Sequence, residues 1–206
     1  MLQLKQTAER DAQPNSREPA IGDYAIIGDC RTAALVSRDG SIDWLCLPHF
    51  SGTSVFAALL DQERGGRFRI RPAGPFRTRR RYFDATGVLE TTFETASGSA
   101  RLLDLMPVAG NLSTLQPLRE ILRIVQGIEG EVTLEVRWEP RPNYSRADAK
   151  LKSRGAIGWS CTWSDELFLL RAEAPLDLVT DENAVVGRIR VEAGQYKVGA
   201  IGGDSN

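Results

Sequence analysis

The chain has 206 residues, of which 42% are hydrophobic, and its formal net charge is −1. A nearly neutral chain lacks the positive charge typical of proteins that bind nucleic acids or anionic membranes, and it has no apolar run near the roughly 20 residues that span a bilayer. We therefore expect neither nucleic acid nor membrane as a partner.

The two ends of the sequence predict tails on either side of one domain. Residues 1–20 are polar and lack the apolar core of a signal peptide. Residues 201–206 are rich in glycine and polar residues, which leaves residues 21–200 as the folded domain. Three cysteines are too few for a disulfide framework and fit a reducing compartment, so we expect a cytoplasmic protein.

Residues 31–47 predict a central β-hairpin. Asp39-Gly40 lies between two apolar runs, which favours a two-residue type I′ turn with positive φ at both residues. That turn places Arg38 opposite Ser41. The pairing that follows sets Leu35 opposite Trp44, Ala34 opposite Leu45, Val36 opposite Asp43, Ser37 opposite Ile42, Ala33 opposite Cys46 and Thr32 opposite Leu47. Because both faces are mostly apolar, we expect the hairpin to be covered on both sides, with Trp44 buried.

The rest of the chain predicts many strands and one helix. Residues 54–66 suggest a short helix, with Ser54 as its N-cap and Gly65-Gly66 at its end. Strands are expected at residues 67–71, 78–83, 88–95, 100–106, 118–128, 131–139, 158–163, 167–172, 184–191 and 195–200. Turns recurring at this spacing indicate an all-β fold, a large antiparallel β-sandwich of the super-sandwich type with one short helix.

Few residues offer catalytic or metal-binding chemistry. His49 is the single histidine, and Cys46-Leu47-Pro48-His49 supplies two zinc ligands at most, so we expect no metal and no cofactor. Of the acidic candidates Asp23, Asp29, Asp43 and Asp104, Asp43 alternates onto an apolar face. A buried carboxylate needs a partner, here Arg31, Arg38 or a loop amide, and this structural role is favoured over a catalytic one.

Several long segments carry a family resemblance. In order, they are IGDYAIIGDCRTAALVSRDGSIDWLCLPHF, RRRYFDATGVLETTFET, GSARLLDLMP, LREILRIVQGIEGEV and WEPRPNY. Together they resemble the N-terminal β-sandwich of glucoamylase- and trehalase-like glycoside hydrolases of family 15. The resemblance implies that such a domain precedes an (α/α)6 barrel, which holds the glutamate pair for inverting hydrolysis. This chain contains no helical array for that pair, so we expect it to be non-catalytic by itself.

One loop departs from the family pattern. Where the family reads P-R-F-D-S-P, this chain reads Pro48-His49-Phe50-Ser51-Gly52-Thr53, which alters a charged contact with the barrel or its substrate. The residues expected to face the barrel or the substrate are Asp29, Arg31, Asp43, Trp44, Pro48, His49 and Phe50. Phe50 either anchors an interface or folds inward to cap the core.

Two functions remain open at this point. In the first, the chain is the N-terminal module of a glucoside hydrolase; its partner is a glycosidase barrel or a second copy of the chain, and an α-glucoside is the candidate ligand. In the second, it is a free-standing β-sandwich that binds a carbohydrate or a protein. An exposed apolar patch beside residues 48–53 would favour the first function, and a concave groove with an exposed Trp or Tyr would favour the second.

Overall fold

A computed structural model describes residues 19–109 and 116–205. Its strands are β1 (Ala25–Gly28), β2 (Ala33–Val36), β3 (Ser41–Leu47), β4 (Thr53–Phe56), β5 (Arg67–Pro72), β6 (Arg77–Tyr82), β7 (Leu89–Thr95), β8 (Gly98–Leu105), β9 (Val108–Ala109), β10 (Gln116–Pro117), β11 (Glu120–Glu139), β12 (Lys150–Ser153), β13 (Trp159–Trp163), β14 (Glu166–Ala172), β15 (Leu176–Val179), β16 (Ala184–Glu192) and β17 (Tyr196–Ser205). The helical elements are the short turns η1 (Ile21–Asp23), α1 (Pro142–Ser145) and η2 (Gly155–Ile157). This arrangement confirms the all-β fold.

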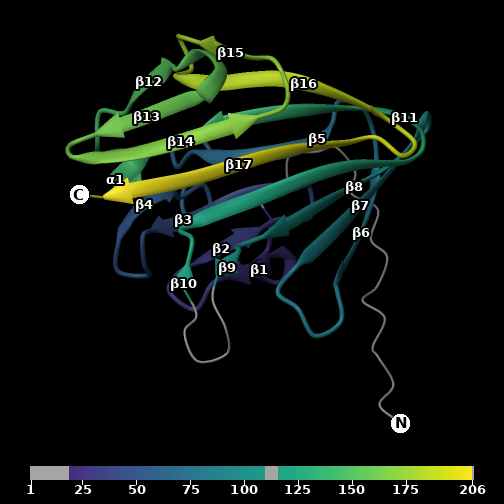
Figure 1. The fold of residues 1–206 in the computed structure, drawn as a ribbon, viewed down its shortest axis with the longest axis horizontal. Coiled ribbons are helices and arrows are strands. Elements are labelled where there is room, and N and C mark those ends of the chain that lie inside the picture. Colours follow the sequence, from purple (N-terminus) through teal and green to yellow (C-terminus); the bar gives the residue numbers. More distant parts are fainter. Residues whose placement is uncertain (1–18, 110–115, 206) are drawn as a thin grey trace.

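The strands form two antiparallel layers packed face to face. The first layer has the order β6, β7, β8, β11, β17, β14, β13, β12. The second layer contains β1, β2, β3, β4, β5, β11, β16 and β15. In Figure 1 the first layer faces the viewer and β2, β3 and β5 lie behind it. The small ladder of β9 and β10 stands apart from both layers.

The long strand β11 joins the two layers. Its first half pairs with β8 and β17, and its second half pairs with β5 and β16. The sequence predicted two strands separated at residues 127–130, but the chain bends there without turning back. A β-bulge between Gly127 and Glu129 makes the bend, and Gly130 has a φ of 60°. The turn between β16 and β17 fixes it, since Gly194 N donates to Gly127 O over 3.0 Å.

The central hairpin is present, but its turn differs from the prediction. Ser37 N donates to Ser41 O over 2.8 Å, so the loop has three residues and ends at Gly40, whose φ is 76°. Val36 therefore pairs with Ile42, and Asp43 becomes the extra residue of a β-bulge. Beyond this bulge the predicted pairs Leu35–Trp44 and Ala34–Leu45 are confirmed. The longer loop and the bulge shift the register in opposite directions and cancel.

Other predictions on local structure were wrong. The expected helix at residues 54–66 is instead the strand β4 followed by turns. The residues from Ser54 to Ala58 are all buried, a pattern that fits an inner strand rather than an amphipathic helix. α1 lies elsewhere and is a single turn in which Asn143 and Tyr144 have positive φ. β17 continues to Ser205, through residues expected to be a tail, whereas residues 1–18 of the N-terminal tail lie outside the described residues.

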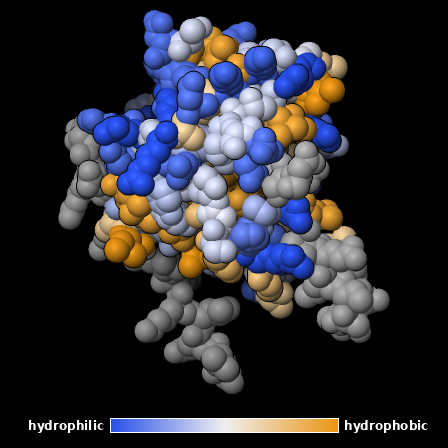
Figure 2. Space-filling view, turned by 90° about the vertical axis from the view of Figure 1, so that its left-hand side faces the viewer, coloured by the Kyte–Doolittle hydropathy of each residue, from blue (hydrophilic) through white to orange (hydrophobic). Residues whose placement is uncertain are grey.

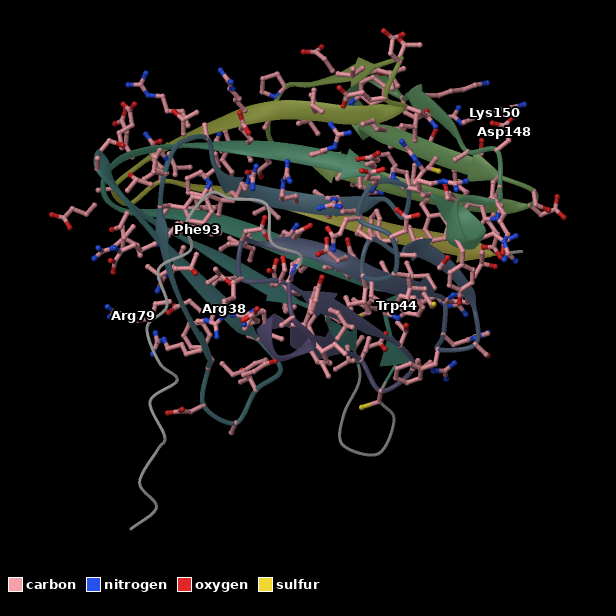
Figure 3. All side chains as sticks on the ribbon, turned by 180° about the vertical axis from the view of Figure 1, so that it is seen from behind. Arg38, Trp44, Arg79, Phe93, Asp148 and Lys150 are labelled. Atoms are coloured by element: carbon pink, nitrogen blue, oxygen red, sulfur yellow. The ribbon has the colours of Figure 1, made fainter. Side chains whose placement is uncertain are left out.

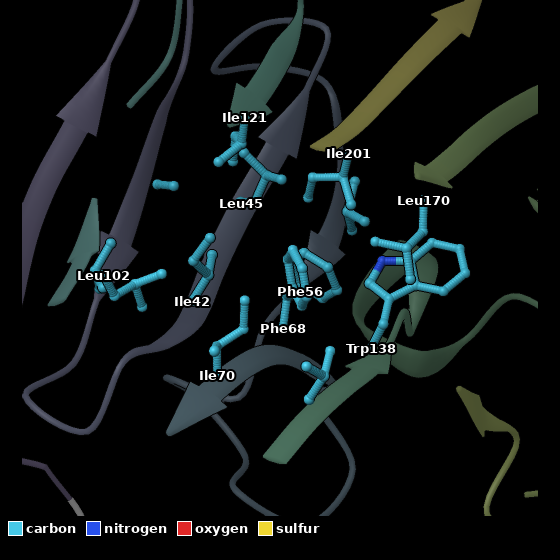
Figure 4. Close-up of a cluster of buried hydrophobic side chains, with 14 of the residues drawn as sticks. Ile42, Leu45, Phe56, Phe68, Ile70, Leu102, Ile121, Trp138, Leu170 and Ile201 are labelled. Atoms are coloured by element: carbon cyan, nitrogen blue, oxygen red, sulfur yellow. The ribbon is translucent and has the colours of Figure 1, made fainter. Parts of the chain in front are cut away.

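The core lies between the two layers and draws on both. Large apolar side chains from β3, β4 and β5 meet those of β8, β11, β14 and β17 (Figure 4). On the second half of β11 the predicted alternation is confirmed, because Val132, Leu134, Val136 and Trp138 are buried. Because the core fills the inner faces of both layers, only the loops and the outer faces remain for contacts with other molecules.

An ion pair lies inside this apolar core. Arg123 on β11 and Asp104 on β8 are directly opposite each other and fully buried, and Arg123 Nε donates to Asp104 Oδ1 over 2.8 Å. Arg123 also donates across the sandwich to Phe68 O and Gly40 O, over 2.6 and 2.7 Å. The arginine thus connects the first layer to β5 and to the hairpin turn of the second.

Candidate functional site

Two loops at one end of the hairpin strands form what we call the loop edge, defined by Asp29, Arg31, Pro48, His49 and Phe50. The first loop joins β1 to β2, and the second joins β3 to β4. Phe50 N donates to Arg31 O over 3.0 Å, which holds the loops together. The structure therefore brings together five of the seven residues that the sequence selected.

Asp29 organises the first loop from within. Its Oδ1 accepts hydrogen bonds from Arg31 N and Thr32 N, at 2.9 and 2.8 Å, in the manner of an Asx turn. The side chain is almost fully buried, yet Oδ2 has no hydrogen-bond partner among the described residues. An unsatisfied buried carboxylate oxygen carries a desolvation penalty that a nearby donor would remove. Asp29 is thus both a structural residue and an incompletely satisfied one.

The second loop presents an aromatic side chain to solvent. Phe50 is 66% exposed, which excludes the alternative that it caps the core. The backbone beneath it is tightly folded, since Gly52 N donates to His49 O over 2.8 Å. A Cβ at Gly52 would come within 2.4 Å of Leu47 O, so this turn requires the glycine. His49 is also exposed, with Nδ1 3.1 Å from Ser51 Oγ.

Asp43 lies away from the loop edge. Tyr24 Oη donates to Asp43 Oδ2 over 2.9 Å, and Ser41 Oγ donates to Asp43 Oδ1 over 2.6 Å. These hydroxyls replace the expected partners, and Arg38 pairs instead with Asp23. Burial, together with the charge and hydrogen bond of Asp43, raises the pKa of Tyr24. With 1% exposure and both oxygens satisfied, Asp43 has the structural role that the sequence favoured.

Trp44 is only half-buried, so the expectation of a buried tryptophan was wrong. Its ring centroid lies 6.0 Å from that of Tyr144, at a tilt of 48°. In the view from behind, Trp44 and Arg38 lie toward opposite ends of the layer (Figure 3). Trp44 therefore belongs to the end of the molecule that carries α1, together with Tyr144 and the exposed Leu60. That end is mostly hydrophilic with separate hydrophobic patches (Figure 2).

Two arginines of β6 pair with acids of the neighbouring strand β7, while Arg80 donates to Val36 O. Arg81 Nε lies 2.7 Å from Glu90 Oε1, and Arg79 Nη2 lies 3.7 Å from Glu94 Oε1. Arg101 on β8 adds a second cation to Glu90. Burial alone would raise the pKa of Glu90, but the hydrogen bonds and charges of Arg81 and Arg101 hold it below its usual range.

Over residues 19–109 and 116–205, no three His, Cys, Asp or Glu side chains are grouped so that they could hold a metal ion. No helix in that part of the chain is long and apolar enough to cross a membrane.

One important residue escaped sequence reasoning. Asp104 was a candidate, but its buried partner Arg123 was not singled out. The signal was available, because Arg123 shares the inner face of β11 with Ile121 and Val125. A charged residue in an inward position requires a counter-charge, and Asp104 occupies the inward position opposite.

These features define an all-β sandwich domain with a filled interior and one loop edge that has exposed and unsatisfied groups. The chain belongs to the family described as trehalase-like, N-terminal, whose model matches residues 15–192. This match confirms the resemblance to trehalase-like proteins seen in the sequence.

Curated relatives named trehalase match the same region. One from Thermoplasma volcanium is 31% identical over 179 residues, which is 84% of this chain and 28% of the relative. Another from Mycolicibacterium smegmatis is 32% identical and covers 66% of this chain and 22% of the relative. Trehalase 1 of Sulfolobus acidocaldarius is 36% identical over 58% of this chain and 19% of its own length. The chain thus spans between about a fifth and just over a quarter of these relatives.

Proposed function

We propose that this chain is the non-catalytic N-terminal module of a trehalase-like glucoside hydrolase, docking to and shaping an (α/α)6 catalytic barrel. The family match and the short span relative to the trehalases support this assignment. The observation that carries the docking role is Phe50, an aromatic side chain held 66% exposed on a hydrogen-bonded loop. Exposed aromatic side chains of this kind are typical anchors of interfaces.

The loop edge is the part of the module that we assign to the barrel or its α-glucoside substrate. Asp29 Oδ2 lacks a donor, and Arg31 and His49 are exposed beside it. Because Asp29 Oδ2 is enclosed, the exposed Arg31 and His49 are the polar groups here that a docked domain or a sugar hydroxyl would contact. Asp43 and Trp44 take no direct part, since the first is enclosed by its hydroxyl partners and the second lies beside Tyr144.

A free-standing carbohydrate-binding domain is less well supported. A groove of about 720 Å³ includes Trp159 in its lining. The indole is half-buried and packs against the core, so it offers little of the free ring face on which a sugar would stack.

The docking role can be tested in a chimaera. Residues of this chain replace the matched segment of the Thermoplasma volcanium trehalase, and hydrolysis of trehalose is measured. We expect an active chimaera whose activity falls with Phe50→Ala but not with Leu60→Ala, a control that removes an equally exposed apolar side chain beyond β4. Equal activities of the two variants would refute the role of Phe50, and sedimentation of the free chain would reveal a second copy as the partner.

A further inference from the structure

The outer face of the first layer is apolar across four adjacent strands. Leu122 on β11 lies opposite Leu105 on β8 and Ala200 on β17, and Ile124 lies opposite Leu103 and Val198. Directly opposite residues share a face of the sheet, so these side chains form one surface. We call it the apolar face, and its residues are Leu103, Leu105, Leu122, Ile124, Leu167, Leu169, Val198 and Ala200.

The second layer shows what a solvated outer face looks like in the same protein. There the outward residues of β11 are Glu131, Thr133, Glu135 and Arg137. Arg188 on β16 pairs with Glu135 at 3.3 Å, and Arg190 pairs with Glu131. The two outer faces therefore differ in kind, because one is charged and internally paired while the other is aliphatic.

Nothing among the described residues covers the apolar face. Ala200 is buried and the other residues of the face are half-buried, and in Figure 1 no element lies in front of β8, β11, β17 and β14. An antiparallel layer with one solvated face normally alternates apolar and polar residues, whereas here the four strands β8, β11, β17 and β14 carry apolar residues on both faces. The charged cluster of Glu90, Arg81 and Arg101 borders this surface beside Leu103. A contiguous, partly exposed aliphatic surface of this kind marks an interaction site.

The borders of the apolar face have two further features. At the β13–β14 side, the groove of about 720 Å³ lies between the segments around Ile157 and Leu176 and reaches Ala200. Arg171 lines this groove, is exposed and has no hydrogen-bond or ion-pair partner in the described ranges. Glu120 and Glu173 line the same groove, so this border carries charges of both signs. The matching surface on a partner is therefore apolar at its centre and polar at this border.

We propose that the apolar face is the main surface on which this module packs against the remainder of a trehalase-like polypeptide. The proposal rests on the proposed function and names the surface that carries it out, with the loop edge as a smaller contact. The occupant follows from the relatives, in which roughly three quarters of the chain lies outside the matched segment. A domain attached in the same polypeptide is present at high effective concentration, which favours it over a second copy.

Hydroxyl-radical footprinting of the free chain and of the chimaera with the Thermoplasma volcanium trehalase tests this surface. We expect oxidation of Leu105, Leu122 and Ile124 to fall severalfold in the chimaera, while Ile128, exposed at the bend of β11, is unchanged. Unchanged oxidation of the apolar face with lowered oxidation of Phe50 would overturn this proposal and leave the proposed function standing. No change at either surface in a folded chimaera would overturn both, and protection in the free chain that grows with concentration would assign the face to a second copy.

A charge-introducing variant tests the face without the chimaera. Leu122→Lys with Ile124→Lys should leave the melting temperature of the free chain nearly unchanged and raise its soluble concentration severalfold. Thr133→Lys, on the outer face of the second layer, is the matched control on the same strand and should change neither. Unfolding of the double variant would show that the face belongs to the packing of the module itself, and unchanged solubility would contradict an exposed aliphatic surface; either result overturns the proposal.

Discussion

Replacing Gly40 by valine should remove a large part of the protein's free energy of unfolding. Gly40 has a φ of 76°, which costs an L-residue about 1–2 kcal/mol. A Cβ there would lie 2.3 Å from Ile70 O, so the turn must move away from β5. Movement also breaks the hydrogen bond from Arg123 Nη2 to Gly40 O, and a buried bond from a charged group contributes about 1.5–3 kcal/mol.

With some overpacking added, the total loss is about 4–6 kcal/mol. For a domain of this size the melting temperature should fall by roughly 10–20 °C. Calorimetry of Gly40→Val beside Gly87→Val measures the effect, because a Cβ at Gly87 meets nothing within 4 Å. If both variants have the same melting temperature, the three-residue turn and its contact with Arg123 are wrong.

Three further perturbations test other parts of the structure. Thiol labelling at about pH 8 should modify the exposed Cys30 quickly and the two buried cysteines only after unfolding. Burial raises the pKa of Cys161 to about 12 and also raises that of Cys46. Equal labelling rates for the three cysteines would contradict this burial. The pKa of Glu90 is held low in the fold, so its stabilisation is complete above the unfolded value of about 4.3 and disappears as the pH falls through the folded value. Unfolding free energies of wild type and Glu90→Gln should therefore converge in acid, and parallel curves would argue against the pairing with Arg81 and Arg101. Arg123→Met should lose about 3–5 kcal/mol because it leaves Asp104 buried without a counter-charge. Adding Asp104→Leu should restore part of this loss, since the hydrogen bonds to Phe68 O and Gly40 O stay absent, whereas additive losses in denaturant titrations would show that the two side chains act independently.

The layered fold was predictable because its signals are local and repeated. Alternation on β11 and the turn residues between strands follow from the period of a pleated strand. The hairpin was predicted for the same reason, but the length of its turn was not. Asp39-Gly40 favours a two-residue loop, whereas the buried contacts of Gly40 with β5 and Arg123 select a three-residue loop. The bulge at Asp43 then restores the predicted register in the rest of the hairpin.

The failed helix has a related cause. The residues from Ser54 to Ala58 are compatible with a helical face by spacing alone, but they are buried on all sides between β3 and the segment around Pro142. Tertiary pairing with β3 therefore overrides the local preference.

The candidate site was predictable only in part. The resemblance located the loop edge, since its residues come from two loops that neighbour each other along the hairpin. It listed the exposed Phe50 beside the enclosed Asp43, because the Tyr24 hydroxyl that completes the enclosure of Asp43 lies 19 residues away and no spacing rule connects the two. The apolar face was likewise hidden, since half-buried leucines on β8, β11, β14 and β17 look like core residues until the strands are placed side by side.

The central claim is that this chain acts as a non-catalytic module. Its most direct test is the hydrolysis of trehalose, with maltose as a second substrate, by the purified free chain, followed as glucose released across a size-exclusion peak. We predict no glucose above the buffer blank in the fractions that contain the folded chain. Turnover that follows the protein peak and survives removal of trace contaminants would contradict the claim.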